Sequence, residues 1–328
     1  MKRWFLSVIG IAVALCIVAS AAMAQTTAEI VGQISQTSYT SYLNDLLYTH
    51  TGDNRGFGAQ HDLAQANIVS QFNSFGLQTT LDPFLYGGST YYNVVATLPG
   101  TTARSNEIFI VGAHYDSVSN PGADDNASGV AGVLEAARVL SQFKFEATLK
   151  FVAFDREEQG LYGSSAWVSE FGGADIRGMI SLDMIAFNDP GSRHDTALLY
   201  GRSASDSVKT ALANAINLYG GGITVSDLGQ FDASDHAPFE WNGKPACLLI
   251  EGAMVTNNYS NPYYHTASDS VDTTNYIDYV YATRMTQSTV GYLADAATAV
   301  PEPSSLLLVA GSCLLLMRVL SNKQRKEP

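Results

Sequence analysis

Residues 112–126, GAHYDSVSNPGADDN, place one histidine and three aspartates between an apolar run and a helical pattern. Further acidic groups follow or interrupt other apolar runs, namely the pair Glu157 and Glu158 and the single residue Asp183. Imidazole and carboxylate groups are ligands that suit zinc, with manganese or cobalt also possible. These residue types therefore indicate divalent-metal chemistry.

Asp183 gives the strongest physical argument for a metal. It lies between Leu182 and Met184 in an apolar run that predicts a buried strand. An ionised carboxylate in such a strand is costly unless a cation compensates it. Arg156 is the one basic residue close in sequence to the other acidic clusters. Converging carboxylates would repel one another, and a divalent cation is the simplest way to neutralise them.

Each of these features also has a simpler interpretation. The stretch from Asp124 to Ser128 could merely cap the helix that follows. Glu157 and Glu158 could be a solvated pair in a loop, and Asp183 could pair with a distant arginine. His265, in the segment NPYYHTASDS, could be an ordinary loop histidine. A metal site requires that these groups meet at one edge of a sheet.

Apolar strand patterns alternate with amphipathic helix patterns along the middle of the chain. Strands are expected at 91–98, 107–114, 148–155, 177–187, 196–201 and 245–252, and helices at 59–75, 128–140, 161–171, 204–219 and 274–297. This alternation predicts a three-layer α/β domain with a mostly parallel sheet. Ligands of such sheets bind beyond the carboxyl ends of the strands. Three strands would therefore bring His114, Glu157 and Asp183 to one rim.

The two ends of the chain differ from this domain in composition. Residues 1–24 predict a secretory signal, because two basic residues precede an apolar run and a small-residue cleavage site; a retained anchor is the alternative. Residues 301–328 combine a Pro-Glu-Pro motif, an apolar stretch and a basic tail. Their order resembles the PEP-CTERM sorting signal of exported bacterial proteins, and a simple tail anchor is the alternative.

The charge balance limits the class of partner. Without the two end segments, which hold six of the 18 basic and two of the 31 acidic residues, the formal charge is near −17. Nucleic-acid binding needs a basic face, so no nucleic-acid partner is expected. Cys16 and Cys313 lie in the end segments, which leaves Cys247 as a buried core thiol without a disulfide partner.

Six motifs resemble, in order, those of the dizinc aminopeptidase family, metallopeptidase family twenty-eight, to which aminopeptidase Y and bacterial leucyl aminopeptidases belong. The motifs are GAHYDS, GADDNASGVA, FDREEQGLYGS, SLDMIAF, SDHAPF and NPYYHTASD, within residues 90–295. The resemblance implies a phosphorylase/hydrolase-like α/β sandwich whose mixed, mostly parallel sheet is flanked by helices. The peptidase domain would occupy residues 25–300, with no room at 75–107 for the protease-associated insert of some members.

The resemblance also implies a set of metal ligands. His114, Asp125 and Asp183 would hold one zinc ion. Asp125, Glu158 and His265 would hold a second ion, so that Asp125 bridges the two zinc ions of each chain.

Other residues match the catalytic groups of the family. Glu157 would be the general base, and Asp116 would orient the imidazole of His114. Tyr264 matches a tyrosine that in some members hydrogen-bonds the tetrahedral oxyanion, although the adjacent Tyr263 is an alternative.

Two basic residues need separate interpretation. Arg156 stands where the family usually has a small or neutral residue, so its charge could contact substrate or pair with Asp155. His236, in SDHAPF, competes with His265 as a ligand. The motif match favours His265, so His236 is expected to be structural.

The sequence thus predicts an exported zinc-dependent exopeptidase, in the first place an aminopeptidase that acts on peptide substrates. A carboxypeptidase, a glutaminyl cyclase and a catalytically inactive surface binding module are the alternatives. The C-terminal resemblance implies transient membrane contact, processing by an exosortase-type enzyme, and a location in the periplasm or at the cell surface.

Overall fold

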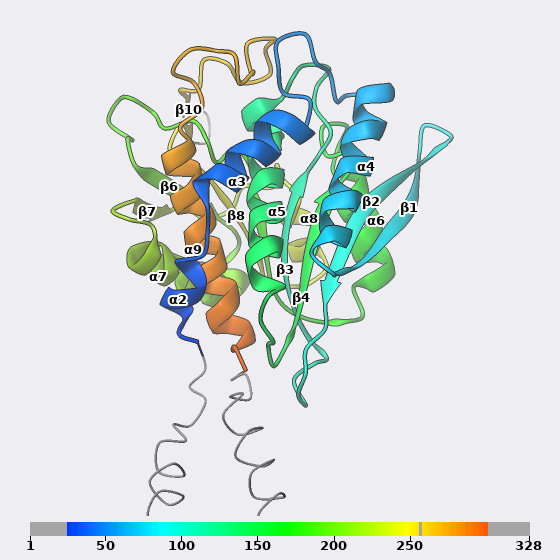
Figure 1. Cartoon of the computed structure of the whole chain (residues 1–328), viewed down its shortest axis with the longest axis vertical. Coiled ribbons are helices and arrows are strands. Elements are labelled where there is room, and N and C mark those ends of the chain that lie inside the picture. Colours follow the sequence, from blue (N-terminus) through cyan, green and yellow to red (C-terminus); the bar gives the residue numbers. More distant parts are fainter. Residues whose placement is uncertain (1–24, 256–257, 301–328) are drawn as a thin grey trace, which may run out of the picture. The chain divides into compact units, whose positions relative to one another are not determined.

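The computed structural model describes residues 25–255 and 258–300, so the predicted signal at 1–24 and sorting segment at 301–328 lie outside the described residues. Thr26–Ala299 form one compact unit (Figure 1). Within the described ranges, no helix is both long and apolar enough to cross a bilayer.

An eight-stranded mixed sheet forms the middle layer. Its order is β1-β2-β4-β3-β5-β8-β6-β7. The strands are β1 (Gln78–Tyr86), β2 (Ser89–Leu98), β3 (Glu107–His114), β4 (Thr148–Phe154), β5 (Asp175–Leu182), β6 (Thr196–Tyr200), β7 (Thr224–Asp227) and β8 (Ala246–Glu251). A separate two-stranded sheet pairs β9 (Met254–Val255) with β10 (Asn258–Tyr259).

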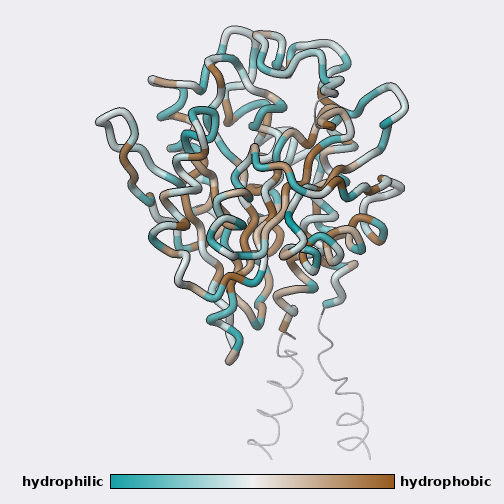
Figure 2. The backbone as a smooth tube through the Cα atoms, turned by 180° about the vertical axis from the view of Figure 1, so that it is seen from behind, coloured by the Kyte–Doolittle hydropathy of each residue, from teal (hydrophilic) through white to brown (hydrophobic). Residues whose placement is uncertain are grey.

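The centre of the sheet is parallel and buried, as the sequence predicts. Strands β4, β3, β5 and β8 are parallel neighbours, whereas β1 with β2, β2 with β4, and β6 with β8 are antiparallel. Strands covered on both faces have nearly continuous apolar sequences, which is why these segments were recognisable. Figure 2 shows this hydrophobic centre from behind.

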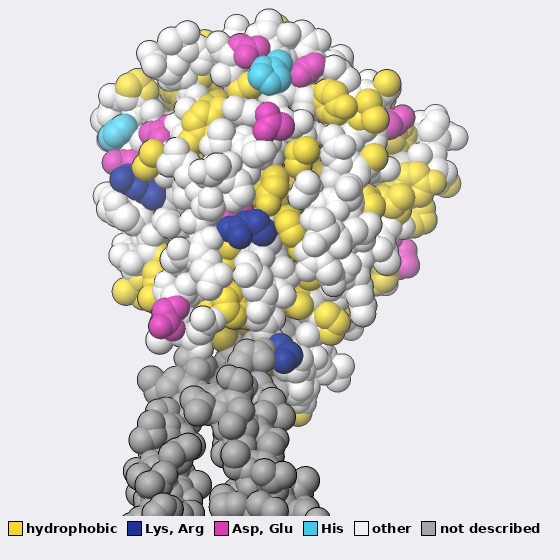
Figure 3. All heavy atoms as spheres, viewed as in Figure 1, with side chains coloured by type: hydrophobic (Ala, Val, Ile, Leu, Met, Phe, Trp, Pro, Cys, Tyr) yellow, Lys and Arg dark blue, Asp and Glu magenta, His cyan; other side chains and the backbone are white. Residues whose placement is uncertain are grey.

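Helices cover both faces of the sheet and complete three layers (Figure 1). One face carries α2 (Thr27–Val31), α3 (Gln36–Ser41), α4 (Ala59–Ser74), α5 (Gly129–Leu140), α7 (Asp206–Tyr219) and α9 (Tyr279–Ala297). The opposite face carries α6 (Tyr162–Phe171) and α8 (His236–Trp241), which pack through Trp167 and Phe239. The predicted α/β sandwich is confirmed. Basic side chains are sparse on the face in Figure 3, in keeping with the acidic composition.

Helix α5 is the element that brings the polar loop after β3 against the end of β5. Nearly all of its residues are buried. A Cβ added to Gly129 would lie 2.4 Å from the carbonyl oxygen of Leu182. Only glycine permits this approach of the helix start to the strand end.

The predicted strand at 177–187 is too long. Strand β5 ends at Leu182, and Met184 has a left-handed conformation with φ of 53°, which takes the chain out of the sheet. Asp183 therefore directly follows the strand instead of lying within it. The closing helix begins at Tyr279 and not at 274. Its N-cap is Asp278, whose side chain accepts hydrogen bonds from the amides of Val280 and Tyr281.

Candidate metal centre

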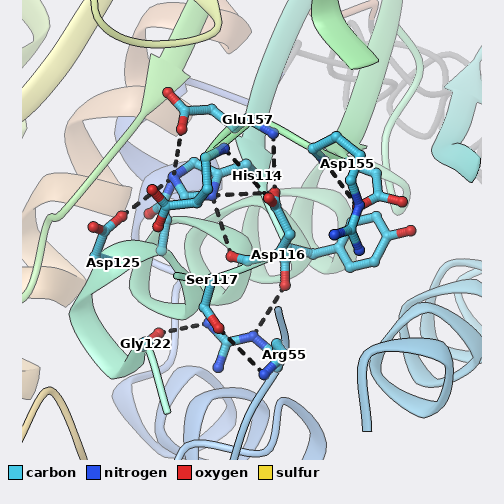
Figure 4. A network of polar contacts seen from close by, with 12 residues as sticks. Arg55, His114, Asp116, Ser117, Gly122, Asp125, Asp155 and Glu157 are labelled. Carbon is cyan, nitrogen blue, oxygen red and sulfur yellow. Dashed lines mark hydrogen bonds and ion pairs between the residues drawn. The ribbon is translucent and has the colours of Figure 1, made fainter. Parts of the chain in front are cut away.

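The carboxyl ends of three adjacent parallel strands bring the predicted ligands together. His114 is the last residue of β3, Glu157 and Glu158 lie in the loop after β4, and Asp183 directly follows β5. Asp125 comes from the kinked segment Ala123–Ser128 that leads into α5, where Asp125 and Asn126 have non-helical backbone conformations. Figure 4 shows His114, Asp125 and Glu157 facing one another.

His114 is buried, with 1% of its side chain exposed, and its Nε2 atom faces three carboxylates. The distances are 3.3 Å to Asp125 Oδ1, 3.7 Å to Asp183 Oδ1 and 4.0 Å to Glu157 Oε2. Its other ring nitrogen, Nδ1, lies 3.5 Å from Asp116 Oδ1. The ring is thus held by Asp116 and presents one nitrogen to the acidic cluster.

His265 meets the same cluster from the loop before α9. Its Nε2 atom lies 3.0 Å from Asp125 Oδ2 and 3.3 Å from Glu158 Oε2. The two oxygens of Asp125 therefore face two different imidazoles. The structure brings all five predicted metal ligands together.

The donor set fits a divalent cation. Ligand atoms of His114, Glu157 and Asp183 lie within 4.8 Å of one another, as do those of His114, Asp125 and Glu158. Glu158 Oε1 is buried without a hydrogen-bond partner. Buried carboxylates with neighbouring imidazoles and an unsatisfied oxygen are the donors expected of a zinc site. Since Glu157 is within ligand distance, geometry alone does not separate a base from a ligand.

The carboxylates of the cluster are hard to ionise together. Burial, followed by the negative charge of Asp125, raises the pKa of Glu158 to about 7. Burial also raises the pKa of Asp183, and burial together with Asp183 raises that of Glu157. A cation among these groups would offset both the burial and the mutual repulsion that raise their pKa values.

For Asp125 and the two histidines, by contrast, the pKa shifts favour the charged form. Burial opposes ionisation of Asp125, but hydrogen bonds to His114 and His265 outweigh it and lower its pKa. Burial also opposes protonation of His265, yet Asp125 and Glu158 raise its pKa to about 10. Asp125 is thus the carboxylate of the cluster that is held ionised.

Asp116 contacts the loop that carries Glu157 and Glu158 as well as the imidazole of His114. Its carboxylate accepts hydrogen bonds from the backbone amides of Glu157 at 3.2 Å and Glu158 at 3.3 Å. One side chain therefore orients His114 and fixes the start of the glutamate loop.

Asp269 was not assigned a role from the sequence, although it ends the motif NPYYHTASD. Its carboxylate accepts the backbone amides of Asp124 at 2.7 Å and Asp125 at 3.1 Å. Asn261 from the same loop donates to Asp124 Oδ2 and Glu251 Oε1. The loop that carries His265 thus also fixes the backbone of Asp125, whose carboxylate lies between the two imidazoles.

The contacts of Asp183, the 124–128 segment and Glu157 bear on the simpler interpretations of these residues. Within the described ranges, Asp183 forms its ion pair with His114 and not with an arginine. The capping interpretation holds in part: Ser128 makes no side-chain cap to α5, but Asn126 Oδ1 accepts the amide of Gly129, the first residue of the helix. Glu157 is only 11% exposed, so it is not a solvated loop residue.

Tyr264, and not Tyr263, lines the cavity beside the cluster. Its ring stacks on His265 with centroids 3.8 Å apart, whereas Tyr263 packs edge-on against Tyr276. Burial raises the pKa of Tyr264, so its hydroxyl keeps its proton at neutral pH. The apolar side of the cavity is formed by Met184, Phe231, Ala233, Ile250 and Met254.

The structure buries both basic residues of open role, Arg156 and His236, and also the core thiol of Cys247. Arg156 is fully buried and pairs with Asp155 at 3.0 Å, so substrate contact is excluded for it in this conformation. His236 is buried in α8, and burial lowers its pKa to about 4, as expected of a structural histidine. Cys247 is a free buried thiol, as predicted.

Comparison with known proteins finds similar sequences and structures. The sequence model of peptidase family M28 matches residues 93–290. The chain is 31% identical over 226 residues to leucine aminopeptidase 1 of Trichophyton equinum, and the match covers 63% of this chain and 58% of that protein. This chain thus spans less than two thirds of the length of that curated relative.

Solved structures share the fold. An aminopeptidase from Aneurinibacillus sp. strain AM-1 has a TM-score of 0.71 at 20% identity, covering 85% of this chain and 98% of that one. BSAP, a zinc aminopeptidase from Bacillus subtilis, has a TM-score of 0.56 at 27% identity, and the match covers 64% of this chain and 51% of that one. Porphyromonas gingivalis glutaminyl cyclase has a TM-score of 0.65 at 22% identity, and the match covers 80% of this chain and 99% of that one. The fold alone therefore does not distinguish peptidase from cyclase.

Proposed function

We propose, for a chain that belongs to peptidase family M28, the function of a zinc-dependent aminopeptidase that removes residues from the N-terminus of peptides. The observation that carries this proposal is the Asp125 carboxylate between two imidazoles, 3.3 Å from His114 and 3.0 Å from His265. Similarity to leucine aminopeptidase 1 supports the reaction, and similarity to BSAP supports zinc as the metal.

The five ligand-type side chains would hold two zinc ions. His114, Asp125 and Asp183 would hold one ion, and Asp125, Glu158 and His265 the other. Bound zinc would supply a Lewis acid that polarises the scissile carbonyl and lowers the pKa of an attacking water.

Glu157 acts in this proposal as the general base. It takes a proton from the attacking water and passes it to the leaving amine. Its raised pKa, caused by burial and by Asp183, suits a group that must accept a proton and release it again. The hydrogen bonds from the Glu157 and Glu158 amides to Asp116 keep the carboxylate of the base in place.

Tyr264 and the apolar cavity wall would position the substrate. The Tyr264 hydroxyl, kept protonated by burial, donates to the oxyanion of the tetrahedral intermediate. An apolar N-terminal side chain would pack against Met184, Ile250 and Met254. This environment is compatible with the leucine preference that the name of the relative states.

A glutaminyl cyclase is the second candidate, because a cyclase shares the fold over 80% of this chain. A panel of aminoacyl, N-blocked and C-terminal peptide substrates, assayed with and without Zn²⁺, separates the candidates. Zinc-dependent release of free N-terminal residues supports the proposal. Cleavage of N-blocked peptides alone would assign a carboxypeptidase, cyclisation of N-terminal glutamine would assign the cyclase, and no turnover would assign a binding module.

We also propose export followed by processing at the C-terminus. The basis is the composition of residues 1–24 and 301–328, which predicts a signal peptide and a PEP-CTERM-like segment that an exosortase-type enzyme would process. Cell fractionation with mass measurement of the mature protein tests it. Loss of both end segments from a periplasmic or surface-exposed protein is expected, and an intact cytoplasmic chain would contradict it.

A further inference from the structure

Three consecutive residues, Arg55, Gly56 and Phe57, lie in the loop before α4 and contact both catalytic loops. We propose that this segment, named here the 55–57 clamp, fixes the loop that carries Asp116 and Asp125 relative to the loop that carries Glu157 and Glu158. The clamp would thereby set the spacing of the metal ligands. This inference rests on the proposed function, since it concerns how tightly that site holds zinc.

Arg55 is the contact to the loop after β3. Its guanidinium is fully buried and donates to the carbonyl oxygens of Tyr115 at 3.0 Å and Gly122 at 2.6 Å, and also to that of Pro121 (Figure 4). Its backbone amide donates to Ser117 Oγ at 3.2 Å. One side chain thus joins both ends of the loop between His114 and Asp125.

Gly56 permits a direct backbone contact with the same loop. A Cβ at this position would lie 2.8 Å from Ser119 Oγ and 3.0 Å from the carbonyl oxygen of Ser117. A larger residue would therefore collide with this loop, and only glycine permits the close approach.

Arg156 is the contact to the glutamate loop. It is fully buried immediately before Glu157, and its Nη1 donates to the carbonyl oxygen of Gly56 at 2.5 Å. Its guanidinium carbon lies 4.2 Å from the ring centroid of Phe57 and 4.4 Å from that of Tyr91. The cation is thus held between two aromatic faces and paired with Asp155.

The backbone of Arg156 shows why this side chain matters at this position. Its φ is 60°, a left-handed conformation that is unfavourable for a residue with a Cβ. Glycine would adopt the turn without strain, whereas the arginine side chain adds the contacts with Asp155, Gly56 and Phe57. Those contacts hold the turn from which the Glu157 and Glu158 amides reach Asp116.

Phe57 is the position at which the clamp can be tested without unfolding the protein, because 51% of it is exposed. Phe57→Leu keeps an apolar cover and removes the aromatic face, whereas Phe57→Trp retains a face for the guanidinium. Phe171→Leu, on α6 and 39% exposed, is the matched control for a surface aromatic residue. Arg156→Lys keeps the charge but loses the planar stack and the fork of donors.

Three quantities should be measured for the full chain: the Zn²⁺ dissociation constant by chelator competition, kcat and KM, and the melting temperature of the metal-free protein. We expect Phe57→Leu and Arg156→Lys to weaken Zn²⁺ binding about tenfold. They should lower kcat while KM changes little. Phe57→Trp should restore both values, and Phe171→Leu should change neither.

A lowered melting temperature with unchanged Zn²⁺ affinity and kcat would show that Phe57 only stabilises the fold, and would overturn the clamp. That outcome would leave the proposed function intact, since wild-type protein would still bind Zn²⁺ and release N-terminal residues. A wild-type protein that binds no Zn²⁺ would overturn both proposals.

Discussion

The Nδ1 atom of His114 lies 3.3 Å from the backbone carbonyl oxygen of Asp116 and 3.5 Å from its carboxylate, so this nitrogen is held by Asp116 and Nε2 faces the acidic cluster. A carboxylate behind a ligating imidazole fixes the ring orientation and increases its basicity. The same Asp116 carboxylate accepts the amides of Glu157 and Glu158. One buried residue therefore couples the end of β3 to the loop after β4.

Glu157→Gln tests the assignment of the base. The amide retains the shape of the side chain but cannot take a proton, so kcat should fall about 100- to 10,000-fold. Bound zinc, measured by metal analysis of the purified protein, should stay at the wild-type level. Glu170→Gln, an exposed change on α6, is the matched control and should leave both values unchanged. Activity within tenfold of wild type would show that Glu157 is not the base.

His265→Ala and His236→Ala separate a ligand from a structural histidine. His265 lies 3.0 Å from Asp125, so its removal should abolish binding of one of the two proposed zinc ions. His236 is fully buried and does not line the cavity beside the cluster, so its removal should cost about 2 kcal/mol of folding stability and spare zinc binding. Metal content and denaturant unfolding measure the two effects, and the reverse pattern would assign His236 as the ligand.

Tyr264→Phe and Tyr263→Phe separate the two adjacent tyrosines. Loss of a hydroxyl that stabilises the oxyanion should lower kcat about 100-fold with little change in KM. Tyr264 lines the cavity, whereas Tyr263 packs against Tyr276, so only the first change should have this effect. Equal kcat values for the two variants would remove Tyr264 from the mechanism.

The buried pair of His61 and Asp155 predicts a pH dependence of stability outside the metal site. Burial lowers the pKa of His61, but hydrogen bonds to Asp155 and Asp62 outweigh it, and the net shift is upward from 6.5. Because the folded pKa exceeds the unfolded one, this stabilisation is present below pH 6.5 and is lost as the pH rises through the folded pKa.

Denaturant unfolding of the metal-free protein measures this effect. Above pH 6.5, the free energy of unfolding should fall more steeply in wild-type protein than in His61→Gln. His194→Gln, which changes an exposed histidine, should retain the wild-type slope. Parallel curves for wild type and His61→Gln would show that the pair does not titrate as described.

The sequence was most informative where a segment is buried on both faces. The parallel strands β3, β4, β5 and β8 appear as apolar runs, and the ligands are recognisable because they follow or precede such runs. Strand β1 was not predicted, because it is a largely exposed edge strand with Pro83 in it. Helices α2 and α3, of five and six residues, are too short to show a helical period.

The missed residues of the site act through backbone groups. The Asp269 carboxylate accepts hydrogen bonds from the backbone amides of Asp124 and Asp125. The Arg55 guanidinium donates to backbone carbonyls that lie more than fifty positions away in the sequence. Any residue offers a backbone amide or carbonyl, so these contacts leave no pattern of residue types in the sequence. They become visible only when the fold brings the loops together.

The most direct test of the central claim is to measure how many Zn²⁺ ions the full chain binds, by titration of metal-free protein, and to locate them by anomalous scattering from crystals. The account predicts two ions per chain, with Asp125 between them and His114 and His265 on separate ions. A single ion, or ions that leave Asp125 without a metal contact, would contradict it.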